Sequence, residues 1–474
     1  MTQTIVIDPV TRIEGHAKIS IQLDEHGFVH DAHFHVTQFR GFEKLCEGRP
    51  FYEMPALMAR ICGICPVSHL VASAKACDAI MAVRIPRAAE NLRRVMNLAQ
   101  ILQSHALNAV HLSGPDLALG MDAPLEQRSL FALADKHPGL ARDGVRLRAI
   151  GQKIIEILGG KRIHPGWIVP GGVASPLEEA QRDAILAVLP DALTMAQRLV
   201  DWFKGVMDDF DEEVRVFGNF PSLFMGLVDE EGNLEHYDGA LRIIDFHAKT
   251  VVQSLPIEKY GDYIGEKVEP WSYLKSPYYK PKGYPGGIYR VGPLARLNIA
   301  ESCGTRWADQ EHAVFEDMDD PLVSSSFHYH YARLIEILFC IERMQELLEA
   351  PEILDKHVRA YASANARRGV GVSEAPRGTL LHDYEVGENG LVRKANLIIA
   401  TGNNNLAMNQ AVLQVAKRFV RGPDVADGML NRVEAVIRAF DPCLSCSTHA
   451  MGKMPIELTI VDAEGRMVRA VDSG

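Results

Sequence analysis

Two Cys-x-x-Cys pairs stand near opposite ends of this 474-residue chain. The first pair is Cys62 and Cys65, and the second is Cys443 and Cys446. Together the pairs offer four thiolates, the donor set that zinc, iron, nickel or an iron–sulfur cluster accepts. Because 381 positions separate Cys62 from Cys443, the site can close only when the whole chain has folded. A local zinc finger closes within tens of residues, so the spacing favours a buried functional metal.

The spacing alone leaves three kinds of site open, namely structural zinc, an iron–sulfur cluster and a catalytic metal. Pro66 predicts a helix that begins just after Cys65, and the positive end of that helix would favour the thiolate of Cys65. Ionisable residues also flank both pairs: Arg60, His69, Asp441 and His449. A sealed structural site does not need such neighbours, so they favour catalysis.

Hydrophobic periodicity predicts a mostly helical chain with a small antiparallel β region, an α+β fold. Residues 4–36 alternate in strand fashion, which places N-terminal strands within 1–40. A helical core is expected over 54–440, with helices at 66–83, 86–112, 142–158, 176–210, 320–349, 405–420 and 424–439. Candidate helix starts are Pro86, Pro321 and Asp424.

Two further stretches do not read as helix. Residues 261–298 are rich in Pro, Gly and Tyr and predict a long ordered loop. Residues 456–461 and 467–471 predict a C-terminal hairpin. Because no linker divides the chain, residues 1–449 are expected to form a single domain, followed by an extension over 450–474.

The charge and the apolar runs of the chain argue against several classes of function. The net charge of −11 argues against nucleic acid as the main partner. No apolar run reaches the roughly 18 residues that a membrane span needs, and the N-terminus shows no signal peptide. We therefore expect a cytoplasmic protein with reduced thiols. The other four cysteines match no ligand spacing and are expected to be small core residues: Cys46, Cys77, Cys303 and Cys340.

The residues around the two pairs resemble the signature motifs of the nickel–iron hydrogenase large subunit. These motifs are Arg-Ile-Cys-Gly-Ile-Cys-Pro-Val-Ser-His at 60–69 and Asp-Pro-Cys-Leu-Ser-Cys-Ser-Thr-His at 441–449. Other segments resemble the family in the same order: 8–16, 40–43, 164–165 with 170–172, 292–296 and 374–378. The length and the second motif look most like the cytoplasmic NAD-reducing, bidirectional subgroup.

This resemblance implies the helical-bundle fold of that family and a ligand set. Cys62, Cys65, Cys443 and Cys446 would hold nickel, and Cys65 and Cys446 would also bridge to an iron that carries carbon monoxide and cyanide. A terminal thiolate keeps a free lone pair, so Cys443 is expected to accept a proton when dihydrogen is split heterolytically. Glu43 and His449 resemble the ligands of a nearby magnesium ion, although an isolated His is more often a packing residue.

Four further residues gain a role only through the resemblance. Glu14 matches a carboxylate that relays the proton, whereas a Glu on an early strand is usually solvated. Arg377 matches an arginine held over the open face of the metals, where it can orient a small ligand but is a poor proton carrier. Asp116 and Asp441 match the carboxylates expected to surround Arg377, since a buried Arg needs such partners. The ordinary role of an Asp before Pro, as in Asp441, is to form a turn.

The resemblance also implies a precursor. A maturation protease would remove everything after His449 once nickel-insertion proteins have loaded the metal, which makes 450–474 a candidate for proteolytic removal and 1–449 the catalytic domain.

The expected reaction is the reversible conversion of dihydrogen to two protons and two electrons. Eight cysteines are too few for both this site and an electron-transfer chain, and no glycine-rich dinucleotide motif follows a strand. The resemblance therefore implies two kinds of partner, a diaphorase module that contains FMN and binds NAD, and a small iron–sulfur hydrogenase subunit. The alternatives are a hydrogenase that uses a deazaflavin or NADP, and a zinc-stabilised non-catalytic scaffold protein.

Overall fold

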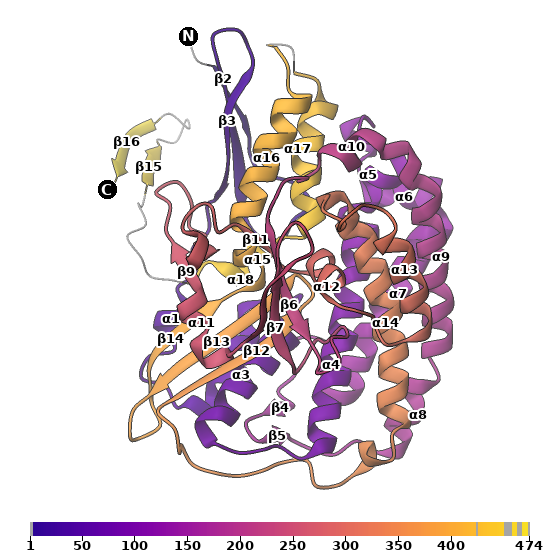
Figure 1. The fold of residues 1–474 in the computed structure, drawn as a ribbon, viewed down its shortest axis with the longest axis vertical. Coiled ribbons are helices and arrows are strands. Elements are labelled where there is room, and N and C mark those ends of the chain that lie inside the picture. Colours follow the sequence, from indigo (N-terminus) through magenta and orange to yellow (C-terminus); the bar gives the residue numbers. More distant parts are fainter. Residues whose placement is uncertain (1–2, 423–424, 450–456, 462–466, 473–474) are drawn as a thin grey trace.

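Four long helices form the body of the protein (Figure 1). They are α4 (Arg87–Ala106), α7 (Pro138–Gly159), α9 (Leu189–Met207) and α14 (Tyr329–Glu349), and they pack side by side. Helix α9 buries one stripe at three- and four-residue spacing, which includes Met195, Leu199 and Phe203, so only one face meets the core. Helix α14 is buried on nearly all sides over its first 13 residues. It is the central helix of the body.

The computed structural model describes residues 3–422, 425–449, 457–461 and 467–472. The other helices are α1 (Phe42–Leu45), α2 (Met54–Met58), α3 (Pro66–Met81), α5 (Gly114–Leu119), α6 (Leu130–Lys136), α8 (Glu179–Leu186), α10 (Asp211–Val216), α11 (Tyr260–Tyr263), α12 (Pro293–Ile299), α13 (Arg306–Glu316), α15 (Ala400–Asn403), α16 (Asn405–Phe419), α17 (Asp427–Phe440) and α18 (Leu444–Ser447). Among the described residues, no helix is long and apolar enough to cross a bilayer.

Small sheets cover one side of the helical body. An antiparallel N-terminal sheet joins β1 (Gln3–Ile7), β2 (Ala17–Leu23) and β3 (Val29–Val36). A second antiparallel sheet joins β12 (Arg368–Ala375), β13 (Gly378–Val386) and β14 (Val392–Ile398). The mixed sheet has the order β11 (Tyr289–Arg290), β6 (Leu223–Val228), β7 (Ala240–Ile244) and β8 (Thr250–Leu255), with β11 parallel to β6. Three two-stranded pairs complete the set: β4 (Ile168–Val169) with β5 (Gly172–Val173), β9 (Ile264–Lys267) with β10 (Ser276–Tyr279), and β15 (Glu457–Val461) with β16 (Met467–Asp472).

The predicted fold class, mostly helical with small antiparallel sheets, is confirmed, and so are the N-terminal strands. The segments 223–255 and 368–398 were assigned to the helical core, but both contain strands. Some of these strands, such as Leu223–Val228, are buried on both faces and so lack an alternating pattern, whereas Thr250–Leu255 is mostly exposed. The long loop 261–298 also contains short strands and part of a helix.

Helix boundaries were predicted less well. The segment 176–210 is two helices, α8 and α9, and α4 passes into a π-helical turn at Leu107–Leu112. Pro321 does not begin a helix, because α14 starts at Tyr329. Asp424 lies outside the described residues, and α17 begins at Asp427. The C-terminal hairpin is present, although Ile456 also lies outside the described residues.

Helix α3 lies unusually close to strand β12, and this contact fixes the start of the helix. Two glycines of β12, Gly369 and Gly371, face α3. A Cβ atom at Gly371 would come within 2.0 Å of the carbonyl oxygen of Ala72 and 2.5 Å of the backbone nitrogen of Ala76. The sequence therefore uses glycine on the strand and alanine on the helix to bring two backbones together. Since α3 begins directly after Cys65, this packing also sets the position of the first cysteine pair.

Replacing Gly371 tests that packing. We expect Gly371→Ala to lower the free energy of unfolding by about 3 kcal/mol, because the new methyl group overlaps backbone atoms that cannot move independently. The matched control is Gly205→Ala on the exposed side of α9, where nothing lies within 4 Å. That change is expected to stabilise the protein by about 0.5 kcal/mol. Urea unfolding of both variants makes the measurement, and an unchanged midpoint for Gly371→Ala would contradict the close packing of α3 on β12.

Candidate metal centre

Four cysteine sulfurs meet in one buried cluster. The Sγ atoms of Cys62 and Cys443 are 3.4 Å apart, and those of Cys65 and Cys446 are also 3.4 Å apart. Cys443 and Cys446 approach to 2.8 Å, and all four sulfurs lie within 4.8 Å of one another. No cysteine of the cluster is more than 4% exposed. The fold thus closes a four-sulfur cage from both ends of the chain, as the spacing predicts.

Short local structures aim each pair inward. Cys62 follows a 3-10 turn at Ala59–Ile61, and its sulfur accepts hydrogen bonds from the backbone N–H groups of Ile64 and Cys65. Pro66 occupies the first turn of α3, as predicted. On the other side, the backbone N–H of Cys443 donates to the Thr401 hydroxyl at 2.9 Å. Thr401 is a neighbour that sequence reasoning missed, because nothing near it in the chain signals a site.

The thiols of the cluster differ in pKa. Hydrogen bonds from Cys443, Cys446 and Cys62 hold the pKa of Cys65 well below its usual range. Burial raises the pKa of both Cys443 and Cys446 well above theirs. A dry pocket with one favoured thiolate and three further soft donors is suited to a soft or borderline metal cation, whose charge would deprotonate the rest. The donor set therefore fits nickel and iron.

Glu14 lies directly against the second cysteine pair. Its Oε2 atom is 3.1 Å from the sulfur of Cys443 and accepts the backbone N–H of Ser445 at 3.1 Å. The Glu14 carbonyl accepts the N–H of Leu444, which forms a parallel bridge between the two segments. Gly15 permits this approach: it has φ +91°, and a Cβ there would lie 2.7 Å from Leu444. Glu14 is half-buried, so its side chain connects the sulfur cluster with the outside.

Arg377 occupies the turn between β12 and β13 and is buried. Its Nε donates to the carbonyl of Asp441 at 2.7 Å and its Nη2 to the Asp441 carboxylate at 3.3 Å. Burial works against the charge, but Asp441 and the thiolates of the cluster hold the pKa of Arg377 well above its usual value. Its Nη1 has no hydrogen-bond partner among the described residues. One arm of the guanidinium is thus free to meet a small ligand.

Asp441 is the carboxylate that the structure brings to Arg377. It adopts a left-handed conformation with φ +54° at the end of α17. Burial raises its pKa, although Arg377 and Arg333 act in the opposite sense. One carboxylate oxygen, Oδ2, has no partner among the described residues.

Asp116, also expected around Arg377, makes its hydrogen bonds to other residues. Asp116 lies on α5 and accepts hydrogen bonds from Arg12 at 2.5 Å, Arg438 at 2.8 Å and Asn431 at 3.1 Å. Arg12 stands two residues before Glu14, and Arg438 stands three residues before Asp441. Asp116 therefore ties the segment of Glu14 to the end of α17 and does not pair with Arg377.

Glu43 and His449 lie side by side at the end of the second motif. The backbone N–H of Glu43 donates to the His449 carbonyl at 3.4 Å. The Glu43 carboxylate accepts the N–H of Leu397 at 2.9 Å and lies 3.7 Å from the ammonium of Lys275, and burial raises its pKa. Burial lowers the pKa of His449 to about 3, and neither ring nitrogen has a partner among the described residues. A neutral, buried and unpartnered imidazole is suited to bind a cation.

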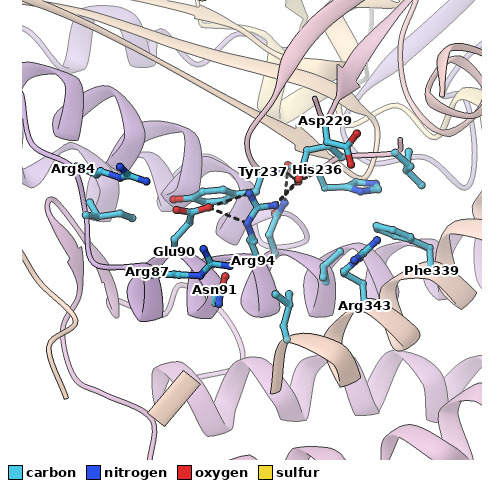
Figure 2. A pocket seen from close by; sticks show the side chains of 16 residues that line it. Arg84, Arg87, Glu90, Asn91, Arg94, Asp229, His236, Tyr237, Phe339 and Arg343 are labelled. Atoms are coloured by element: carbon cyan, nitrogen blue, oxygen red, sulfur yellow. Dashed lines mark hydrogen bonds and ion pairs between the residues drawn. The ribbon is translucent and has the colours of Figure 1, made fainter. Parts of the chain in front are cut away.

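The other singled-out residues are not part of the four-sulfur cage, although a hydrogen bond from His69 also lowers the pKa of Cys65. Burial raises the pKa of each remaining cysteine thiol, which fits core packing: Cys46, Cys77, Cys303 and Cys340. His69 meets His382 at 3.2 Å between ring nitrogens, a pairing that sequence reasoning missed because 313 positions separate the two. A cavity of about 340 Å³ is lined mainly by α4 and the segment around His236 (Figure 2), and none of the four cysteines is among its described lining residues.

The fold and the cluster define an enzyme with a thiolate-ligated metal. The sequence profile described as nickel-dependent hydrogenase matches residues 40–123 and 226–449, and one described as HoxL-like matches 4–39. The chain is 41% identical to the beta subunit of the NAD-reducing hydrogenase HoxS of Cupriavidus necator, over 99% of each chain. It is also 41% identical to the matching chain of the vhu F420-non-reducing hydrogenase of Methanocaldococcus jannaschii, over 87% of this chain and 98% of the relative.

Solved structures agree with this assignment. The crystal structure of an NAD+-reducing [NiFe]-hydrogenase in the H2-reduced state has a TM-score of 0.92 and 42% identity, and the match covers 94% of this chain and 99% of that one. The Ni-Fe-Se hydrogenase of D. vulgaris Hildenborough, 24% identical with a TM-score of 0.77 over 95% of this chain and 100% of that one, shares the fold. The chain belongs to the nickel-dependent hydrogenase family. It is a catalytic subunit of the nickel–iron type, and the predicted family is confirmed.

The Asp116 cluster predicts a pH-dependent stability. Burial opposes ionisation, but Arg438 and Arg12 outweigh it and lower the pKa of Asp116. A depressed carboxyl pKa adds stability that is present above the unfolded value, about 3.9, and is lost as the pH falls through the folded value. We expect Asp116→Asn to lower the free energy of unfolding by about 3 kcal/mol at pH 7, because Arg12 loses its hydrogen-bonded carboxylate and Arg438 keeps only Glu434, 3.2 Å away.

Urea unfolding from pH 7 down to pH 3 measures this effect. The difference between the native protein and Asp116→Asn should be constant down to about pH 5 and shrink below about pH 4. The exposed Asp135 provides the matched control, and Asp135→Asn should stay within about 0.5 kcal/mol of the native protein. A difference for Asp116→Asn that did not change with pH would show that the carboxylate charge is not what holds the two arginines.

Proposed function

We propose that this chain catalyses the reversible oxidation of dihydrogen to two protons and two electrons, which leave through partner proteins and finally reduce NAD. The observation that carries the proposal is the contact between a buried four-thiolate cluster and one half-buried carboxylate, Glu14. A structural zinc site has no use for a carboxylate against one sulfur or for a buried guanidinium facing the others. The alternative of a zinc-stabilised scaffold is therefore disfavoured.

The four cysteines would divide into two facing pairs. Cys62 and Cys443 would be terminal ligands of nickel, and Cys65 and Cys446 would bridge nickel to an iron that carries carbon monoxide and cyanide. The positions of the four cysteines in the two motifs, which the nickel-dependent hydrogenase profile covers over 40–123 and 226–449, support this division. When bound, the metals supply the Lewis acid that polarises dihydrogen and the redox centre for its two electrons.

Side chains of this chain move the proton. The sulfur of Cys443 holds the first proton, and Glu14 Oε2, 3.1 Å away, receives it. The N–H of Ser445 donates to the same oxygen and holds it beside the sulfur. Because Glu14 is half-buried, its carboxyl group can pass the proton outward without opening the sulfur cluster to water.

Arg377 would orient a small ligand at the metals. Its charge persists at neutral pH, so it polarises and positions but does not relay protons. Asp441 holds the guanidinium in place through two hydrogen bonds. Asp116 acts indirectly. It holds Arg12 and Arg438 and so fixes the segments that contain Glu14 and Asp441.

A second, harder cation would lie beside this centre. We infer that Glu43 and His449 bind magnesium, with the unpartnered ring nitrogens of His449 and the buried Glu43 carboxylate as support. This ion would hold the end of the second cysteine motif against α1. Chain cleavage after His449, once nickel has been loaded, would remove 450–474 and leave 1–449 as a single catalytic domain.

The relatives suggest the partners. A NAD-reducing hydrogenase that matches this chain over 99% of its length supports two of them, a diaphorase module with FMN and NAD, and a small iron–sulfur hydrogenase subunit. A maturation protease and nickel-insertion proteins would act on the precursor, and the complex would be cytoplasmic. An F420-non-reducing relative is equally identical over a shorter stretch, and its name gives no support to a deazaflavin acceptor, so the alternative of a deazaflavin or NADP is not favoured.

Glu14→Gln tests the proposal in the complex purified with its partners. Glutamine can accept the Ser445 N–H but cannot take up a proton, so dihydrogen-dependent NAD reduction should fall by a factor of about 100 or more. Nickel and iron content should not change. Glu25→Gln, at a side chain that is 79% exposed, is the matched control and should keep full activity.

Two results would contradict this account in different ways. Undiminished activity of Glu14→Gln would exclude Glu14 as the relay. A native complex that oxidises dihydrogen with NADP or a deazaflavin, but not with NAD, would exclude the acceptor while leaving the hydrogenase reaction intact.

A further inference from the structure

A fully buried ionic cluster lies behind the turn that bears Arg377. Its members are Arg296 on α12, Glu336 on α14 and Glu374 on β12, and each side chain is 0% exposed. The two carboxylates come from elements 38 positions apart in sequence, and Arg296 joins them. Burying three charges is costly unless every hydrogen-bonding group is satisfied.

Arg296 uses all five of its N–H donors. Two bonds of 2.6 Å reach the two oxygens of Glu336, and one of 2.7 Å reaches Glu374. The remaining two donors bind backbone carbonyls, at 3.0 Å to Ala375 and 3.3 Å to Pro376. These are the two residues immediately before Arg377, so the guanidinium holds the backbone of the turn as well as its own counter-ions.

The turn is clamped from the other side by backbone. Gly292, four residues before Arg296, has φ +95°, and a Cβ there would lie 2.8 Å from the carbonyl oxygen of Arg377. Gly378, directly after Arg377, has φ +134° and would meet Val291 at 2.2 Å. The segment Val291–Arg296 therefore contacts the turn before, at and after Arg377. Little room is left for the base of the Arg377 side chain to shift.

The cluster itself is anchored in the helical body. Glu336 accepts a bond of 2.7 Å from His105 of α4, and burial lowers the pKa of His105 to about 4, so this imidazole donates as a neutral group. His236 lies 3.4 Å from the other oxygen of Glu336. His236 also lines the cavity shown in Figure 2, which makes it the side chain between the cluster and that cavity. Helices α4 and α14 thus fix Glu336 and, through Glu336, Arg296.

We propose that Arg296, held by Glu336, is a positioning residue that sets the direction from which the Arg377 guanidinium faces the four sulfurs. This inference rests on the proposed function, because Arg377 acts on a ligand there. All five hydrogen bonds of Arg296 go to oxygen atoms and none to a sulfur, so its effect passes through the carbonyls of Ala375 and Pro376. The buried charges are thus retained for geometry at the metal centre.

Arg296→Lys separates geometry from charge. Lysine keeps the positive charge but has three donors on one atom, so it cannot bind Glu336, Glu374 and two carbonyls together. The first readout is amide hydrogen exchange within 375–378, at Ala375, Arg377 and Gly378, in the complex, and it does not depend on any activity. Exchange there should be at least about tenfold faster in Arg296→Lys. Unchanged exchange would overturn the proposal, whether or not the complex oxidises dihydrogen.

A double-mutant cycle with Arg377→Lys supplies the second readout. Arg296→Lys should lower kcat about tenfold in the native background, since a shift of about 1 Å in a positioned group costs up to about 100-fold. In the Arg377→Lys background the same change should cost less than about twofold, because the residue it positions is already lost. Equal losses in both backgrounds would show that Arg296 does not act through Arg377.

The matched control is Arg93→Lys, which alters a similar buried pair away from the turn. Arg93 is 0% exposed and binds Asp78 at 2.6 Å. The Arg93→Lys variant should lower Tm as Arg296→Lys does. It should leave kcat and the exchange rates at 375–378 within about twofold of the native values. If Arg296→Lys does not fold, Glu336→Gln releases the same guanidinium and enters the same cycle. If Arg93→Lys and Arg296→Lys lost kcat to the same extent for the same loss of Tm, Arg296 would contribute only to stability.

Discussion

Everything near the centre depends on keeping four thiol groups within 4.8 Å in a dry pocket. Thiolates at that distance repel one another strongly in a low-dielectric interior, so the arrangement needs a cation among them and fixed positive or hydrogen-bonding groups around them. The protein supplies the second part itself. Backbone N–H groups cap Cys62, the Thr401 hydroxyl holds the backbone of Cys443, and Arg377 places its charge beside the cluster.

That requirement explains the buried charges farther out. Several guanidinium groups near the centre are paired with carboxylates, and these carboxylates are held in turn by a second element. Asp441 balances Arg377, Asp116 balances Arg12 and Arg438, and Glu336 with Glu374 surrounds Arg296. Arg12, Arg438 and Asp441 come from the two ends of the chain, whereas Asp116 lies on α5 and Glu336 on the central helix α14. The same interactions that close the sulfur cage also place Glu14 and Arg377 on it.

Sequence reasoning could find the cluster because residue type and local motif reveal metal ligands. Cys-x-x-Cys followed by Pro66 also predicted the start of α3 correctly. The sheets of 223–255 and 368–398 were not predicted, because Leu223–Val228 is an apolar run without alternation and Gly378–Val386 is buried although it contains polar residues. The hydrogen-bond partners of Asp116 and Arg296 could not be predicted for another reason. Their contacts join residues 40 to more than 300 positions apart, and no local pattern encodes which buried Arg meets which carboxylate.

Metal content per chain tests the central claim most directly. The complex is purified without oxygen together with its partners, nickel, iron and zinc are measured, and the intact mass of this chain is taken from the same sample. The account predicts one nickel per chain, one iron beyond those in iron–sulfur clusters, and a chain that ends at His449. One zinc in place of nickel, on a chain already cut after His449, would contradict it and make the four cysteines structural.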